Sequence, residues 1–176
     1  MVSLHQEIPN QPPSFLWDPI TPIGNAGNLP INEGSFWHYI NDNEDKFSIY
    51  KHLVITAQLE RLFNSIQTSM TFFVPLDSSL LSKHSENIYL NMDKNQALSI
   101  LNYNTLPRVI DSKTIKSSQK LKLETRIRGQ KMCSKIKGNT IYLNINSVRV
   151  VNEDIIVNNG LVHWTDDFCI PEFNGY

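Results

Sequence analysis

The chain has 176 residues, 40% hydrophobic and 19% charged, with a formal net charge of −1. This length can bury one sizeable core and is short for two, so we expect one domain. Two cysteines are too few for a disulfide scaffold, and no apolar run is long enough to cross a bilayer.

Residues 1–34 are predicted to form an extended, Pro-rich N-terminal arm. Six of the nine prolines lie within the first thirty positions, which excludes a long regular element there. Apolar anchors for such an arm are Leu16, Trp17, Ile20 and Ile23. They would dock the arm on its own domain, residues 35–176, or on a neighbouring copy, giving self-association.

The N-terminus lacks the basic start and apolar run of a secretory signal peptide. No Asn-x-Ser/Thr glycosylation sequon occurs, although asparagine is abundant. These features favour an intracellular or virion-associated protein over a trimmed ectodomain. The frequent Asn, Ile and Lys indicate an AT-rich genome, such as that of a protist or a large DNA virus.

Helices are predicted first along the chain. Ser35 is expected to cap a short helix, and residues 48–64 continue in helical register. Asp77 and Asp93 are each expected to cap a further helix that follows directly. The expected buried positions of the second helical region are Ile49, Leu53, Ile55, Leu59, Leu62, Phe63 and Ile66.

Strands are predicted next. Apolar and charged residues alternate over residues 120–128, as in a half-buried strand. Residues 141–145 and 148–151 repeat this period, and Asn159-Gly160 predicts a tight hairpin turn with positive φ at Gly160. Cys133 and Cys169 fall in such patterns, where they are either free buried thiols or a single bridge between strands. Helices followed by antiparallel strands indicate an α+β fold.

Three segments carry a family resemblance: Thr71–Asp77 (TFFVPLD), Leu101–Pro107 (LNYNTLP) and Asn152–Pro171 with its Asp-Ile, Asn-Gly and His-x-x-Asp elements. In this order they resemble the signature segments of fasciclin-like domains, an adhesion and matrix-interaction family. The resemblance implies a wedge-shaped antiparallel β-sandwich flanked by helices. It also implies partner binding through Tyr103 and Asn104, where the family usually has Tyr-His and Asn104 departs from it, and through Asp154 and Ile155. The alternative for Tyr103 is a structural role, with its ring packed in the core and its hydroxyl paired.

The most uneven charge lies in residues 113–137, with nine cations against one acid, Glu124. Such a face would bind a polyanion such as a sulfated glycan, an anionic lipid headgroup or nucleic acid. The expected contacts are Lys120, Lys122, Arg126, Arg128 and Lys131. The alternative is a solvated outer face whose cations discourage edge-to-edge strand pairing.

Enzymatic motifs are absent from the sequence: it has no Gly-x-Ser-x-Gly, no phosphate-binding glycine loop and no His/Cys spacing for zinc. His163 beside Asp166 and Asp167 is expected to be a satisfied, partly buried histidine, with Asp166 bonded to backbone. We therefore predict a non-enzymatic interaction module without cofactor or metal, binding a protein receptor or glycan. The alternatives are a polyanion-binding protein and a structural assembly component, such as one of a virus particle.

Overall fold

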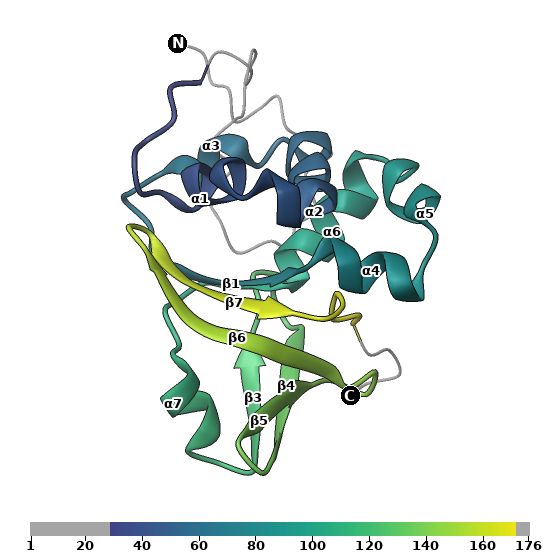
Figure 1. Ribbon diagram of the computed structural model, residues 1–176. Helices are drawn as coiled ribbons and strands as arrows, with labels where there is room; N and C mark the ends of the chain where they lie inside the picture. Colours follow the sequence, from purple (N-terminus) through teal and green to yellow (C-terminus); the bar gives the residue numbers. More distant parts are fainter. Residues whose placement is uncertain (1–28, 172–176) are drawn as a thin grey trace.

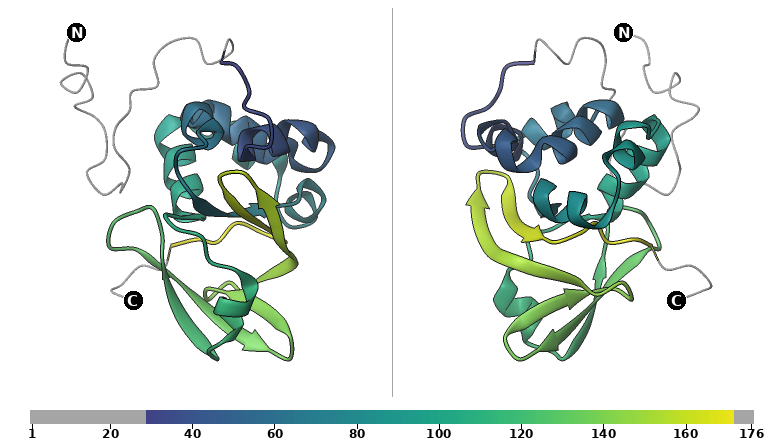
Figure 2. Two further views of the ribbon diagram at one scale, coloured as in Figure 1. Left: turned by 90° about the vertical axis from the view of Figure 1, so that its left-hand side faces the viewer. Right: turned by 45° about the vertical axis from the view of Figure 1, so that its right-hand side comes forward.

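The computed structural model describes residues 29–171. A layer of helices covers one end of a sheet whose far half turns away from it (Figures 1 and 2). The helices of this layer are α1 (Phe36–Asp42), α2 (Glu44–Ala57), α3 (Glu60–Asn64), α4 (Asp77–Lys83), α5 (Glu86–Leu90) and α6 (Lys94–Tyr103). A further helix, α7 (Ser112–Lys116), lies on the other side of the sheet (Figure 1). The predicted α+β fold is thus confirmed.

Two helix caps follow the sequence prediction. The Ser35 hydroxyl accepts a hydrogen bond from the His38 backbone N–H at 3.1 Å. Asp93 forms a reciprocal capping box with Gln96, at 2.8 and 2.9 Å. Each cap satisfies backbone donors that have no partner within the helix.

The predicted cap at Asp77 is wrong. Leu76 occupies the N-cap of α4, and the Asp77 carboxylate instead accepts from the backbone N–H groups of Ser48 and Ile49 in α2, at 2.8 and 2.9 Å. Those two groups follow Phe47, whose backbone leaves helical geometry and breaks α2. Asp77 therefore caps the restarted part of a helix nearly thirty residues earlier.

The buried face of α2 also differs from the prediction. Its buried residues include Ile49, Leu53 and Ala57, whereas Ile55 is 48% exposed. Ile55 lies two positions after Leu53, which places it on nearly the opposite side of the helix. Ile66 lies beyond the end of α3 and is 57% exposed.

Within residues 29–171 the strands form one seven-stranded sheet in the order β2-β1-β7-β6-β5-β4-β3. Their bounds are β1 (Met70–Pro75), β2 (Thr105–Leu106), β3 (Lys120–Glu124), β4 (Lys131–Lys137), β5 (Thr140–Leu143), β6 (Val148–Val157) and β7 (Gly160–Thr165). The long strand β6 reaches from the helix-covered half to the half formed by β3, β4 and β5 (Figure 1). The sheet bends along β6, and this bend gives it a wedge-like shape.

One strand pair departs from the antiparallel prediction: β1 and β7 run parallel, from Met70↔Gly160 to Pro75↔Thr165. Every residue of β1 is buried. Parallel strands are typically covered on both faces, and residues Met70–Val74, apolar except for Thr71, have the matching composition. The pairing joins segments ninety residues apart, so local periodicity does not reveal it.

The predicted hairpin forms between β6 and β7, shifted by one residue. Val157 pairs with Gly160, so the loop residues are Asn158 and Asn159. Gly160 has the predicted positive φ, +148°. The Asn159 side chain accepts from Phe36 N at 2.8 Å and donates to Phe63 O at 2.9 Å, which fixes the hairpin to the helical layer.

Stacked aromatic rings form the centre of the core. Phe36 stacks on Phe72 with a centroid distance of 3.6 Å, and Phe63 meets both rings edge-on at 5.3 Å. The two cysteines are free: Cys133 is half-buried and Cys169 is fully buried. Burial raises the pKa of the Cys169 thiol, so this group stays protonated.

Candidate functional site

Cationic side chains collect on the outer face of the β3–β6 half of the sheet. Cross-strand register pairs Lys120 with Lys135, Lys135 with Tyr142, and Tyr142 with Arg149. Residues directly opposite each other point to the same face of a sheet, so these four form one row across four strands. We define the basic face as Lys120, Lys122, Lys131, Lys135, Lys137 and Arg149, all exposed.

Arg149 was missed by the sequence prediction because it lies outside residues 113–137. The sequence pattern could nevertheless have indicated it, since the apolar residues Val148 and Val150, both buried, stand on either side of Arg149. An apolar-polar-apolar triplet in a strand places the central residue on the opposite face. Tertiary structure then brings that face alongside β5.

The prediction that Arg126 belongs to the binding surface is wrong. Strand β3 ends at Glu124, and the chain turns there, with Thr125 N donating to Gln130 O. Arg126 is 5% exposed, and its Nε donates to Asn102 Oδ1 at 2.9 Å. Burial lowers the pKa of its guanidinium to about 9. Arg128 is exposed as predicted, but it lies in the turn between β3 and β4.

Tyr103 and Asn104 occupy the interior, at 1% and 0% exposure. The Tyr103 hydroxyl donates to Lys131 O at 2.9 Å and accepts from Asn144 Nδ2 at 2.8 Å. The Asn104 amide exchanges two hydrogen bonds with the backbone of Cys169, at 2.8 and 2.9 Å. Tyr103 thus joins α6 to β4 and to the turn after β5, and Asn104 joins the end of α6 to the segment after β7. Their burial is incompatible with the predicted direct contact to a partner.

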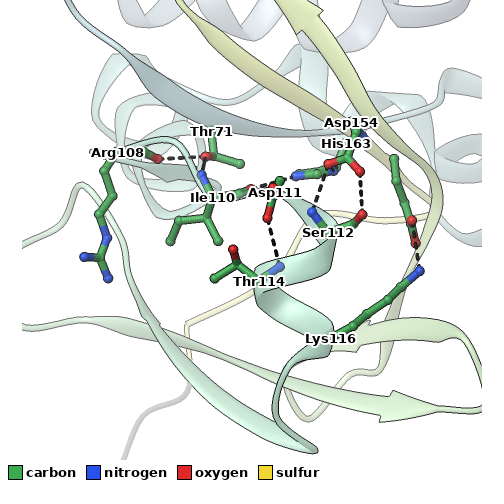
Figure 3. A network of polar contacts seen from close by, with 10 residues as sticks. Thr71, Arg108, Ile110, Asp111, Ser112, Thr114, Lys116, Asp154 and His163 are labelled. Carbon is green, nitrogen blue, oxygen red and sulfur yellow. Dashed lines mark hydrogen bonds and ion pairs between the residues drawn. The ribbon is translucent and has the colours of Figure 1, made fainter.

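Asp154 lies in a bulge of β6 and has a positive φ of 61°. Its carboxylate accepts from the backbone N–H of Ser112 at 2.9 Å and also from the Ser112 hydroxyl, at the start of α7 (Figure 3). Beside it, the Lys116 ammonium contacts Glu153 at 3.0 Å. The Asp154 carboxylate thus attaches α7 to the sheet. Asp154 is 40% exposed and Ile155 is half-buried, and partner contact through this dipeptide stays a prediction.

His163 supports the same bulge from β7. Its Nδ1 accepts from the Asp154 backbone N–H at 3.1 Å, and its Nε2 then donates to Ile110 O at 3.1 Å (Figure 3). These partners assign the neutral tautomer with the proton on Nε2. Burial lowers the pKa of His163, opposed by its bond to Ile110 and by Asp154. His163 is thus a histidine with both ring nitrogens satisfied, as predicted, but it is fully buried and not partly buried.

The acidic residues after β7 also have structural roles. Asp166 accepts from Arg149 N at 2.9 Å, as predicted, and Asp167 contacts His84 at 3.1 Å. Within residues 29–171, no cluster of three or more His, Cys, Asp or Glu side chains is arranged to hold a metal ion. In the same range, no helix combines the length and apolar character that a membrane crossing requires.

Comparison with known proteins agrees with this geometry. The family model described as "Fasciclin domain" matches residues 45–171. Among solved structures, the chain is similar to a FAS1 domain pair from the insect cell adhesion molecule fasciclin I, with a TM-score of 0.67 and 15% identity. The match covers 78% of this chain and 51% of that one, so the chain spans about half the length of that structure. A search of curated proteins found no match. The chain therefore belongs to the fasciclin domain family, whose members are generally non-enzymatic modules of cell adhesion and protein interaction.

Proposed function

We propose that this chain is a non-enzymatic interaction module that binds a sulfated glycan through the basic face. The row Lys120–Lys135–Tyr142–Arg149 carries the proposal. Neighbouring strands lie about 4.8 Å apart, so this row extends over roughly 14 Å, long enough to follow a linear polyanion.

Electrostatics supports a binding role for this face. Within the described residues, none of its six cations forms an ion pair. Like charges directly opposite on adjacent strands destabilise a sheet, and Lys120 and Lys135 are such a pair. An anionic partner would remove this repulsion.

Protection of a sheet edge does not explain the whole face. Lysines on β3 protect an edge strand, since β3 ends the strand order. Strands β4 and β6 lie inside the sheet, yet they carry Lys131, Lys135, Lys137 and Arg149. Cations on interior strands have no edge to protect, which favours recognition of an anion.

A glycan is favoured over nucleic acid. Tyr142 is the aromatic residue of the row, and the Lys137 ammonium lies 5.6 Å from its ring centroid. Proteins that bind single-stranded nucleic acid generally stack several bases on aromatic side chains. The described part of this face offers one such ring, whereas sulfate groups require only the cations.

Heparin-affinity chromatography tests the proposal. Changing Lys120, Lys122 and Lys135 to Glu should abolish retention. A matched variant with Lys46, Arg61 and Lys94 changed to Glu alters charge equally at exposed positions of the helical layer, and should still bind. In the unchanged protein, the affinity for heparin should fall steeply with salt concentration. The slope of the logarithm of the binding constant against the logarithm of the salt concentration should be about −1 per ionic contact.

Equal loss of retention in both variants would show that net charge, and not this face, is responsible. Retention of the first variant on the column would show that the basic face is not the heparin-binding site. Tighter binding to single-stranded DNA than to heparin at the same salt would overturn the choice of a glycan.

A further inference from the structure

A cavity of about 370 Å³ opens on the basic face. Its lining residues are Lys120, Leu121, Lys122, Cys133, Ser134, Lys135, Asn144 and Ile145. They come from β3, β4 and the turn after β5. Three of the eight are cations and none is acidic.

Strand register explains why the cations surround the opening. Lys120 lies opposite Lys135, and Lys122 lies opposite Cys133, so these four side chains share one face. The lysines form the rim. Cys133 is half-buried between them and contributes a weakly polar floor.

Asn144 makes the remaining wall rigid. It adopts a positive φ of 59° and exchanges hydrogen bonds with Cys133, its N–H donating to Cys133 O at 2.7 Å and its Oδ1 accepting from Cys133 N at 2.9 Å. Its Nδ2 donates to the buried Tyr103 hydroxyl. This arrangement places Ile145, 69% exposed, against the cavity.

The lining therefore combines positive charge with apolar surface. Ile145, Cys133 and the lysine methylene stems offer apolar contacts, while the ammonium groups extend towards solvent. Leu121 lies opposite the buried Ser134, and its side chain packs against the core on the other face of the sheet. Cavities of a few hundred Å³ with few polar groups are typical of small-molecule sites. A linear polysaccharide would contact the rim cations but has no apolar body to fill such a cavity.

We propose that this cavity binds a small amphipathic anion, with one sulfonate, sulfate or carboxylate at the lysines and an aryl or acyl body against Ile145 and Cys133. The inference rests on the proposed function only in sharing Lys120, Lys122 and Lys135. The basic face binds polyanions by charge alone, whereas the cavity adds selection for an apolar body.

Fluorescence titration of the full chain with 8-anilinonaphthalene-1-sulfonate tests the site. Binding should saturate at one probe per chain. N-phenyl-1-naphthylamine, which lacks the sulfonate, should bind much more weakly. Lys122→Gln should raise the dissociation constant about tenfold, because it removes a charge-assisted contact.

Two cavity variants separate this site from the polyanion surface. Cys133→Phe should fill the cavity without changing charge, abolishing probe binding while heparin retention persists. Ile145→Ser, at an exposed position, should weaken the probe without disturbing the fold. Circular dichroism verifies folding, and if Cys133→Phe does not fold, the Ile145 variant decides.

Cysteine modification provides a second readout. N-ethylmaleimide should label Cys133 and not the fully buried Cys169, and the bound probe should slow labelling.

Unchanged probe affinity in both cavity variants, or equal binding of the uncharged analogue, would overturn the inference. If heparin is retained but the sulfonate never binds, the cavity inference fails alone. If the sulfonate binds but heparin does not, the proposed function fails alone.

Discussion

At the scale of single residues, Gly160 shows how one position can serve both a turn and a strand pair. It begins β7 with a φ of +148°, and a Cβ there would lie 1.8 Å from the Met70 carbonyl oxygen of β1. A side chain would therefore oppose both the backbone conformation and the parallel β1–β7 pairing.

We predict that Gly160→Ala lowers the free energy of unfolding by about 3 kcal/mol or more, because positive φ and a backbone clash act together. Urea denaturation measures this loss. The matched control is Gly138→Ala, where φ is +62° but a Cβ would meet nothing within 4 Å. This control should lose about 1 kcal/mol. Equal losses in the two variants would show that the approach to Met70 is unimportant.

At the scale of elements, the network around His163 joins β7, the β6 bulge and α7 (Figure 3). Nδ1 must be unprotonated to accept from the Asp154 N–H, and Asp154 in turn holds the first turn of α7. Protonation of His163 would therefore remove one of the bonds that support the bulge.

This network predicts acid-sensitive stability. Burial lowers the pKa of His163 in the folded protein below its ordinary value of 6.5. The unfolded chain therefore binds a proton at this histidine more readily than the folded protein does. The contribution of His163 to the stability of the fold is complete above pH 6.5 and is lost as the pH falls towards the pKa in the folded state. The slope approaches about 1.4 kcal/mol per pH unit for one proton.

Urea unfolding between pH 5 and 8 checks this expectation. His163→Gln should be less stable at neutral pH and should flatten the slope below pH 6.5. His52→Gln, in α2 and outside this network, is the control and should retain the slope. An unchanged slope in the His163 variant would assign the acid sensitivity to other groups.

At the scale of the whole molecule, residues 29–34 attach the start of the described chain to distant elements. Asn158 donates to Gly34 O at 2.7 Å and to Glu33 O at 2.9 Å. Asn64 and Asn32 exchange further bonds at 2.7 and 2.8 Å. The arm predicted over residues 1–34 thus ends in a docked segment. Its proposed anchors, Leu16, Trp17, Ile20 and Ile23, lie outside the described residues.

We predict that deleting residues 1–34 lowers the free energy of unfolding by about 2 kcal/mol more than deleting residues 1–28, because several hydrogen bonds are lost. Light scattering on both variants and on the full chain tests the assembly alternative. An oligomer that dissociates on removal of residues 1–28 would support docking of the arm on a neighbouring copy. The same number of chains per particle in all three would count against it.

The sequence by itself determined those features that depend on near neighbours. The caps at Ser35 and Asp93 join groups three residues apart, and the alternation in β3 depends only on the pleat of one strand. Three short motifs in order were also sufficient for the family, because each describes a local turn or junction.

Tertiary structure alone decided which distant segments meet. Asp77 caps α2, Asn159 fixes the hairpin to α1 and α3, and β1 pairs in parallel with β7. Arg126 continues the alternating pattern in sequence, but the strand has ended, and its side chain enters the interior beside Asn102. Periodicity shows which face a residue takes while a strand continues. It does not show where the strand ends or which surface lies beyond it, because those depend on packing between residues far apart in the chain.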